Sequence, residues 1–147
     1  YHRCCARAFA LAPNDPGIRL GFARAMISRG DAVSAEALLS EATKERPEDG
    51  DAWLELARLR RWTATENHVE SLERAVAVTS NPRSKAASCY ALYKELDDVG
   101  LTTHAMSWLQ SGAKSLRSTF SYSAETDEAA LARIALSFPD ERLRHAP

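Results

Sequence analysis

The chain has 147 residues, with 19 Lys and Arg against 20 Asp and Glu and a formal net charge of −1. This length allows one domain or a short array of repeats and leaves no room for a second catalytic domain. The balanced charge argues against nucleic acid or an anionic membrane as the main partner. No apolar run approaches the roughly 20 residues that cross a bilayer, so we expect no membrane segment.

The N-terminal stretch "YHRCCARAFA" lacks the charged, apolar and small-residue order of a signal peptide. Because Tyr1 stands where an initiator Met is usual, we expect the chain to be part of a longer protein. Cys4, Cys5 and Cys89 form no CxxC pair, and their number is odd. We therefore expect free thiols in a reducing compartment, which favours the cytoplasm.

Alanine, leucine, arginine and glutamate dominate the periodic segments, and alternation of β-branched residues is nearly absent, so we predict an all-α fold. Residues 1–13 are interpreted as half a helical hairpin, the second helix of a preceding unit. Its missing partner helix would leave Phe9 and Leu11 exposed or covered by sequence outside the chain.

A full hairpin is predicted over about 14–48. Asp15 followed by Pro16 is typical of a helix start, because the carboxylate accepts free amide protons and proline fits the first turn. This helix should reach about Arg29, and Gly30 should take the left-handed exit. Asp31 is then predicted to cap the second helix.

The next hairpin is predicted over about 49–82, after Pro47 ends the preceding helix. Asp49 or Asp51 should start a helix that reaches about Arg61. Thr63 and Glu66 have the spacing of a capping box for the second helix, which we expect to be longer than its counterpart in the preceding unit.

The third hairpin, about 83–118, should begin at Asn81-Pro82, turn at Gly100 and restart at Thr102 or Thr103.

Residues 119–147 change in character. An aromatic, small-residue loop precedes a stretch that Ser123 or Thr126 can cap, with Leu131, Ile134 and Phe138 on one helical face. We predict a capping helix that closes the last apolar face of the array, followed by a linker toward a further domain.

The turns recur at a fixed interval, since Pro13 and Pro47 lie 34 residues apart. Two helices in a 34-residue period resemble the tetratricopeptide repeat, which implies a right-handed superhelix of antiparallel hairpins. A single hairpin buries too little apolar surface to be stable, so neighbouring copies must stack through small residues. The residues expected at these close contacts are Ala23, Ala42, Ala57, Ala75, Ala105 and Gly112. Their large counterparts are Phe22, Leu39, Trp53, Leu56, Leu72, Leu92 and Leu109.

A narrower resemblance covers residues 92–139. This stretch is similar to the last repeat and linker that precede the catalytic domain of bacterial tetratricopeptide-repeat sulfotransferases. The positions in matching places are Leu92, Lys94, Leu96, Gly100, Gly112, Tyr122, Asp127 and Phe138. The phosphate-binding loop and the catalytic base of that family would lie beyond Pro147, so the resemblance assigns no catalytic residue to this chain.

No pattern in the sequence predicts a catalytic site, a metal site or a cofactor. The two glycines of "GIRLG" (17–21) lack the preceding strand and the spacing of a nucleotide-binding loop. The four histidines, His2, His68, His104 and His145, have no pair at i, i+4, and we interpret them as surface or capping residues.

The inner face of the superhelix is the candidate binding site, and its partner class would be a protein or peptide. Charges on adjacent turns of one helix, with an arginine on its neighbour, suit an acidic or aromatic peptide held by bidentate hydrogen bonds. The predicted peptide-binding residues are Arg24, Leu54, Glu55, Arg58, Arg61, Tyr90 and Lys94. The same side chains also fit an ordinary solvated helix face, and Trp62 is expected either to pack over the turn or to meet a ligand.

The sequence therefore predicts a non-catalytic interaction region, the N-terminal accessory part of a sulfotransferase-like protein. Its partner would be another protein, a peptide or a downstream domain of the same chain. The alternative is a free-standing adaptor that binds an acidic or aromatic peptide in its concave groove.

Overall fold

The structure is a computed structural model, which describes residues 2–121 and 123–137. The described residues contain helices and no strand. The helices are α1 (His2–Leu11), α2 (Pro16–Ile27), α3 (Ala32–Glu45), α4 (Gly50–Arg58), α5 (Val69–Val78), α6 (Pro82–Asp98), α7 (Thr102–Arg117) and α8 (Ala124–Ser137). The fold is all-α, as predicted.

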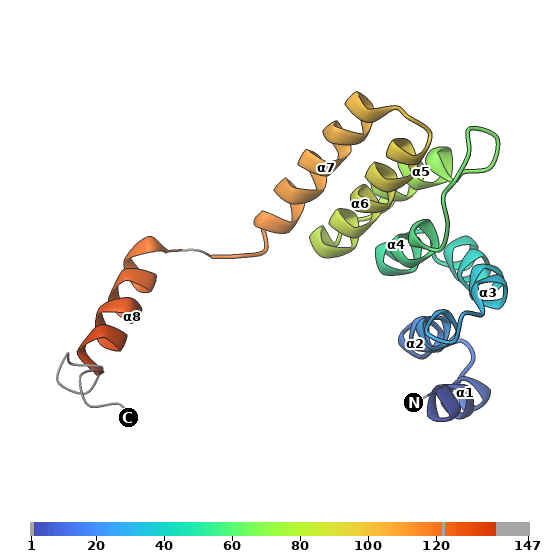
Figure 1. Cartoon of the computed structure of the whole chain (residues 1–147), viewed down its shortest axis with the longest axis horizontal. Helices are drawn as coiled ribbons and strands as arrows, with labels where there is room; N and C mark the ends of the chain where they lie inside the picture. The colour runs from blue at the N-terminus through green and yellow to red at the C-terminus, as the bar shows by residue number, and fades with distance from the viewer. Residues whose placement is uncertain (1, 122, 138–147) are drawn as a thin grey trace, which may run out of the picture.

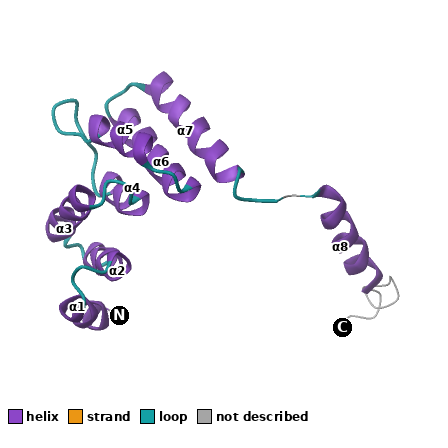
Figure 2. Cartoon of the chain, turned by 180° about the vertical axis from the view of Figure 1, so that it is seen from behind, coloured by secondary structure: helices purple, strands orange, loops and turns teal. Residues whose placement is uncertain are grey.

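Helices α1 to α7 stack side by side into a curved solenoid of tetratricopeptide-like hairpins (Figure 1). Contacts join α2 to α3 and α6 to α7 within hairpins, and α4 to α6 between neighbouring units. In both views α2, α4 and α6 lie on the inner side of the curve, and α3 and α5 lie on the outer side (Figure 2). The hairpins therefore present one continuous inner face.

The predicted signals start and stop the first full hairpin. An Asp15 carboxylate oxygen accepts from the amide of Ile18 at 2.9 Å, and Asp31 accepts from the amide of Ser34 at 3.2 Å. Gly30 has a φ of 81°, in the left-handed region that favours glycine. These local interactions satisfy helix-end amides that otherwise have no partner.

The later hairpins begin in the same way. Asp49 accepts from the amide of Ala52 at 3.1 Å, which decides between the two predicted caps of α4. The Asn81 side chain accepts from the amide of Ser84 at 3.2 Å at the start of α6. Gly100 turns the chain with a φ of 84° before α7 begins at Thr102.

The prediction for the start of the fifth helix is wrong. Thr63 does accept from the amide of Glu66 at 3.1 Å, but this contact lies inside a loop, and α5 begins only at Val69. Helix α5 has 10 residues, fewer than the 14 of α3, so the expectation of a longer second helix also fails.

The physical reason for the long loop is its attachment to α6. The amide of Trp62 donates to a carboxylate oxygen of Asp98 at 2.9 Å, and the amide of His68 donates to Glu95 at 2.5 Å. These bonds satisfy backbone groups that helix hydrogen bonds would otherwise use. Helix α5 consequently starts late and packs on α6.

The core runs along the solenoid between the helices. Trp53, Leu56, Leu39, Leu72 and Leu92 are all buried, as predicted. Five of the predicted small contact residues are also buried, namely Ala23, Ala57, Ala75, Ala105 and Gly112. The sixth, Ala42, is half-buried against the core. Phe22 and Leu109, predicted as large counterparts, are half-buried.

Gly50 marks a close contact that the sequence analysis does not identify. A Cβ at this position would lie 1.9 Å from the carbonyl oxygen of Ser84. The amide of Gly50 also donates to the hydroxyl of Ser84 at 2.8 Å. Only a residue without a side chain allows the start of α4 to approach α6 this closely.

At the N-terminus, α1 packs on α2. The ring of Phe9 stacks on Phe22 with centroids 4.9 Å apart, so the expectation that Phe9 is exposed is wrong. Leu11 is exposed, as expected for one side of a half hairpin.

Helix α8 begins where predicted, with the Ser123 hydroxyl accepting from the amide of Thr126 at 3.3 Å. It lies apart from the solenoid (Figures 1 and 2). Leu131 and Ile134 are exposed. In this arrangement the helix does not cover α7, and its capping role stays a prediction. Tyr122, Phe138 and His145, named in the sequence analysis, lie outside the described residues.

Candidate peptide-binding face

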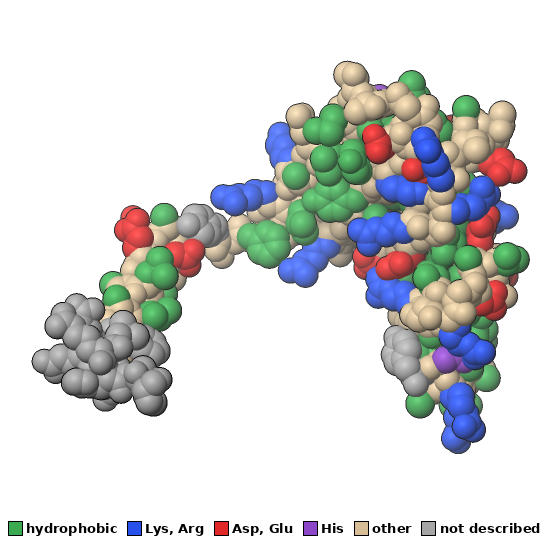
Figure 3. Space-filling model, viewed as in Figure 1, with side chains coloured by type: hydrophobic (Ala, Val, Ile, Leu, Met, Phe, Trp, Pro, Cys, Tyr) green, Lys and Arg blue, Asp and Glu red, His purple; other side chains and the backbone are tan. Residues whose placement is uncertain are grey.

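The inner face is formed by one side of α2, α4 and α6. Figure 3 shows Lys and Arg side chains gathered in a row over these helices, with acidic side chains between them. Of the predicted binding residues, Arg24 belongs to α2, Leu54, Glu55 and Arg58 to α4, and Tyr90 and Lys94 to α6, while Arg61 follows α4 in the loop. Their hydrogen bonds decide which of them a partner can reach.

Arg24 and Glu55 join two neighbouring inner helices. The Nη2 of Arg24 lies 2.8 Å from Oε1 of Glu55, and its Nε donates to the same oxygen at 2.9 Å. The Arg24 side chain is 48% exposed and that of Glu55 only 18%. The pair thus connects α2 to α4, while one side of the guanidinium stays accessible.

Lys94 and Arg61 are held at the other end of the face. The Nζ of Lys94 lies 2.5 Å from a carboxylate oxygen of Asp98 and also donates to the carbonyl oxygen of Arg60. Arg61 donates from Nη2 to the backbone carbonyl of Asp98 at 3.3 Å. These two predicted ligand-binding cations therefore hold the α4–α5 loop against α6.

Arg58 differs from the other cations of the face. Its side chain is exposed on α4, and no hydrogen bond or ion pair joins it to any residue in the described part of the chain. Leu54, one turn earlier on the same helix, is half-buried against the core. Arg58 is consequently the predicted binding residue whose charge is most available to a partner.

The side chains of Tyr90 and Trp62 pack against other parts of the solenoid, so they do not join Arg58 in holding a peptide. A Cβ placed on Gly112 would lie 2.8 Å from Cε1 of Tyr90, so this half-buried ring packs on α7. Trp62 is buried, and its Nε1 donates to the carbonyl of Ala57 at 2.9 Å. Of the two predicted roles for Trp62, packing over the turn is therefore correct.

Glu95 and His68 form a polar pair, buried at Glu95 and half-buried at His68, that the sequence-based predictions did not include. Glu95 is fully buried in α6, and its Oε1 lies 2.8 Å from Nδ1 of His68. The His68 ring makes an edge contact with Trp62, with centroids 4.4 Å apart. The available signal was a glutamate between Leu92 and Leu96 on a core-facing helix. The pair holds the α4–α5 loop against α6.

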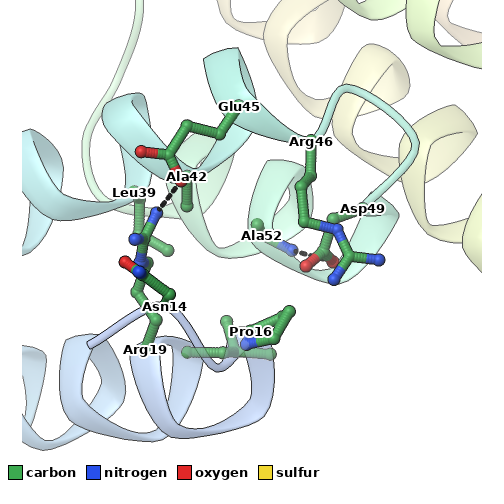
Figure 4. A pocket seen from close by; sticks show the side chains of 10 residues that line it. Asn14, Pro16, Arg19, Leu39, Ala42, Glu45, Arg46, Asp49 and Ala52 are labelled. Carbon is green, nitrogen blue, oxygen red and sulfur yellow. Dashed lines mark hydrogen bonds and ion pairs between the residues drawn. The ribbon is translucent and has the colours of Figure 1, made fainter. Parts of the chain in front are cut away.

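Arg19 and its surroundings form a small cavity between α2, α3 and α4. Figure 4 shows Arg19 directed from α2 toward Glu45, with Nη1 to Oε2 at 2.6 Å. The cavity has about 20 Å³ of space. A single water molecule needs about that much, so this site is too small for a substrate or a cofactor.

Within the described ranges, no group of three or more His, Cys, Asp or Glu side chains is arranged to hold a metal ion. In that same part of the chain, no helix is both long enough and apolar enough to cross a bilayer.

Comparison with known protein families gives a match in the N-terminal part of the chain. Residues 4–59 match the family model described as "Tetratricopeptide repeat". The match supports a tetratricopeptide-repeat protein, in agreement with the 34-residue period and the stacked hairpins. Searches of curated proteins and of solved structures returned no significant match. Tetratricopeptide repeats typically act without catalysis and mediate contacts between proteins, which fits the inner face.

Proposed function

We propose that this chain is a protein-interaction region whose inner face binds an extended acidic peptide segment of a partner. The observation that carries this proposal is that Arg58 of α4 is exposed and has no hydrogen bond or ion pair to another described residue, while Arg24 of the neighbouring α2 is partly accessible. A guanidinium binds a carboxylate through two parallel hydrogen bonds, which gives both affinity and orientation. The neighbouring Leu54 and Glu55 would shape the face without supplying the main attraction.

Arg61, Lys94 and Tyr90 have a different place in this proposal. Their present contacts set the end of the face, where α6 meets the α4–α5 loop and α7. The proposed peptide therefore crosses α2 and α4 first, and its affinity depends most on Arg58.

The proposal is tested with a fluorescein-labelled hexaglutamate peptide, with a hexalysine peptide as the opposite-charge control. Fluorescence anisotropy should show binding of hexaglutamate, weakened by added salt, and no binding of hexalysine. Losing one charged hydrogen-bond partner costs about 1.5–3 kcal/mol, so Arg58→Glu should weaken binding at least about tenfold. Arg74→Glu, at an exposed position on α5, should change affinity less than about twofold. Equal binding by Arg58→Glu and wild type would remove the inner face from consideration.

We further propose that the chain is the accessory part of a sulfotransferase-like polypeptide. The support is the resemblance over residues 92–139, together with the order of a Gly100-turned hairpin, a linker and a separate helix. In this role the downstream domain, or the protein it modifies, would be the partner. The gene sequence after Pro147 tests it. Absence there of a strand followed by a phosphate-binding loop rich in Pro, Gly, Ser and Thr would exclude this association.

A reducing compartment such as the cytoplasm is part of the proposal. Cys4, Cys5 and Cys89 are free in the structure, and burial raises the pKa of the Cys89 thiol. A raised pKa lowers the thiolate fraction and so slows oxidation. Mass spectrometry of the alkylated native protein should find three reduced thiols, and a disulfide at Cys4 or Cys5 would contradict this location.

A further inference from the structure

A cleft lies between the outer helices α3 and α5, and neither Arg24 nor Arg58 lines it. Residues of α3, α4 and α5 form its walls together with Pro47, and its volume is about 320 Å³. Helix α3 packs on α2 and α4, whereas α5 packs on α6, and the cleft remains between these two sets of contacts. Ligand-binding pockets typically measure about 300–1,000 Å³, so this outer cleft has room for one large chemical group.

The outer cleft is apolar inside. Val78, at the end of α5, is 68% exposed, while the Trp53 ring and Thr43 are buried at the base. The indole Nε1 of Trp53 donates to the carbonyl of Pro47 at 2.9 Å, and the hydroxyl of Thr43 donates to the carbonyl of Ser40 at 3.2 Å. The base therefore has no free donor, and an apolar group that covers it would be removed from water together with Val78.

Two cations flank the outer cleft, one from each helix. Lys44 of α3 is exposed, and no hydrogen bond or ion pair joins its ammonium group to another described residue. Arg74 of α5 is 69% exposed, and its pair with the equally accessible Glu70 spans 3.6 Å. Such a surface pair contributes little, so Arg74 can exchange Glu70 for another carboxylate at small cost. None of the described residues that line the cleft is Asp or Glu.

We propose that the outer cleft is a second protein-docking site, which takes one large apolar side chain of a partner segment that has an acidic residue on each side of it. The apolar side chain would cover Trp53 and Val78, and the two carboxylates would pair with Lys44 and Arg74. A purely acidic segment offers no group for the apolar base, so hexaglutamate is not a ligand of this site. The inference does not rest on peptide binding by the inner face.

The probe is a synthetic heptapeptide with one phenylalanine between two glutamates and with glycines at both ends. Titrated into the isotope-labelled whole chain, it should shift the NMR signals of the Trp53 indole N–H and of the Lys44 and Val78 amides. The indole signal of Trp108, which lies on α7, should stay in place. The same peptide with alanine instead of phenylalanine should bind at least about fivefold more weakly, because it buries less apolar surface. Hexaglutamate should leave the Trp53 signal unchanged.

Charge and apolar contact are tested by separate variants. Lys44→Glu and Arg74→Glu should each weaken heptapeptide binding at least about threefold, since each replaces an attraction by a repulsion. Val78→Asp should weaken it at least about fivefold, because it places a carboxylate beside the apolar base. Val33→Asp is the matched control: Val33 is an exposed valine of α3 that does not line the cleft, and its variant should bind as the wild type does. Unchanged positions of the other NMR signals show that each variant has kept its solenoid.

Three results would overturn the proposal. An unmoved Trp53 signal at saturating heptapeptide would show that the cleft takes no such group. Equal affinity of wild type and Val78→Asp would place the contact elsewhere. A wild-type dimer in analytical ultracentrifugation that Val78→Asp converts to a monomer would show that a second copy occupies the cleft. The two proposed sites fail separately, because hexaglutamate binding that depends on Arg58 can persist when the heptapeptide does not reach Trp53.

Discussion

Arg19 and Trp53 make the same hydrogen bond in successive repeats. The Nε of Arg19 donates to the carbonyl of Pro13 at 3.1 Å, and the indole Nε1 of Trp53 donates to the carbonyl of Pro47 at 2.9 Å. Both donors and both acceptors lie 34 residues apart. An arginine therefore replaces the large aromatic residue and keeps its polar contact, while its charge is paired with Glu45.

Because the two positions are equivalent, we expect Arg19→Trp to be tolerated and Trp53→Ala to destabilise the fold. Trp53→Ala should cost about 3–5 kcal/mol in the free energy of unfolding, because a large buried side chain is lost. Arg19→Trp should stay within about 1 kcal/mol of the wild type, since its indole can donate to the same carbonyl. Urea denaturation measures both. A collapse of Arg19→Trp comparable to that of Trp53→Ala would refute the equivalence.

Gly50 and Gly21 form a pair for testing close helix contact. Gly50→Ala should destabilise the protein by at least about 1–3 kcal/mol, because its Cβ would overlap the backbone of Ser84. Gly21 lies inside α2, where an added Cβ would meet nothing within 4 Å. Gly21→Ala should therefore stabilise by about 0.5–1 kcal/mol through helix propensity. Thermal unfolding followed by circular dichroism distinguishes the two, and a stabilising Gly50→Ala would contradict the α4–α6 contact.

Glu95 is predicted to hold the α4–α5 loop. Glu95→Ala removes the acceptor for the amide and ring of His68, and each buried donor left without a partner costs about 1–3 kcal/mol. Glu95→Gln should cost less, because its amide oxygen still accepts. Hydrogen exchange should accelerate in residues 62–68 for Glu95→Ala. Asp97→Ala, at an exposed position on the same helix, is the control and should change stability by less than about 0.5 kcal/mol.

Cys89 predicts a pH dependence of stability. Burial raises the pKa of its thiol in the folded protein, with Lys85 acting weakly in the opposite direction. Above about pH 8.5 the unfolded chain releases this proton while the folded chain retains it, so stability falls as pH rises. The contribution is complete below the unfolded pKa and is lost as pH rises through the folded pKa.

The measurement is the urea midpoint of wild type and Cys89→Ala between pH 7 and pH 10. The midpoint of Cys89→Ala should fall less over this range, and Cys4→Ala, at an exposed thiol, should follow the wild type. Parallel curves for wild type and Cys89→Ala would show that the buried thiol contributes nothing to the alkaline loss.

Local signals predicted most of the fold because their interactions span few residues. The caps of Asp15, Asp31 and Asn81 and the left-handed turns at Gly30 and Gly100 all follow from residues within one turn. The loop before α5 failed as a prediction for the opposite reason. Its hydrogen-bond partners, Glu95 and Asp98, come from a helix about thirty residues later, and no local pattern reveals them.

For the candidate binding face, too, the sequence predicts the positions of the charged residues, while only the structure shows how they are paired. Helical periodicity and the repeat register place Arg24, Arg58 and Lys94 on the inner helices. Whether each cation is available depends on partners from other helices, such as Glu55 for Arg24, or on its own helix, such as Asp98 for Lys94. Only the packed structure distinguishes Arg58, exposed and unpaired among the described residues, from cations that hold the solenoid together.

By itself, the sequence determined that this protein is an all-α array of hairpins with a 34-residue repeat, because helix caps, glycine turns and apolar spacing act over one or two turns. The tertiary structure decided which charges pair, which glycine sits against a backbone, and how far α5 and α8 depart from the regular pattern. Those outcomes depend on contacts between helices distant along the chain, where burial and geometry determine the energy of each side chain.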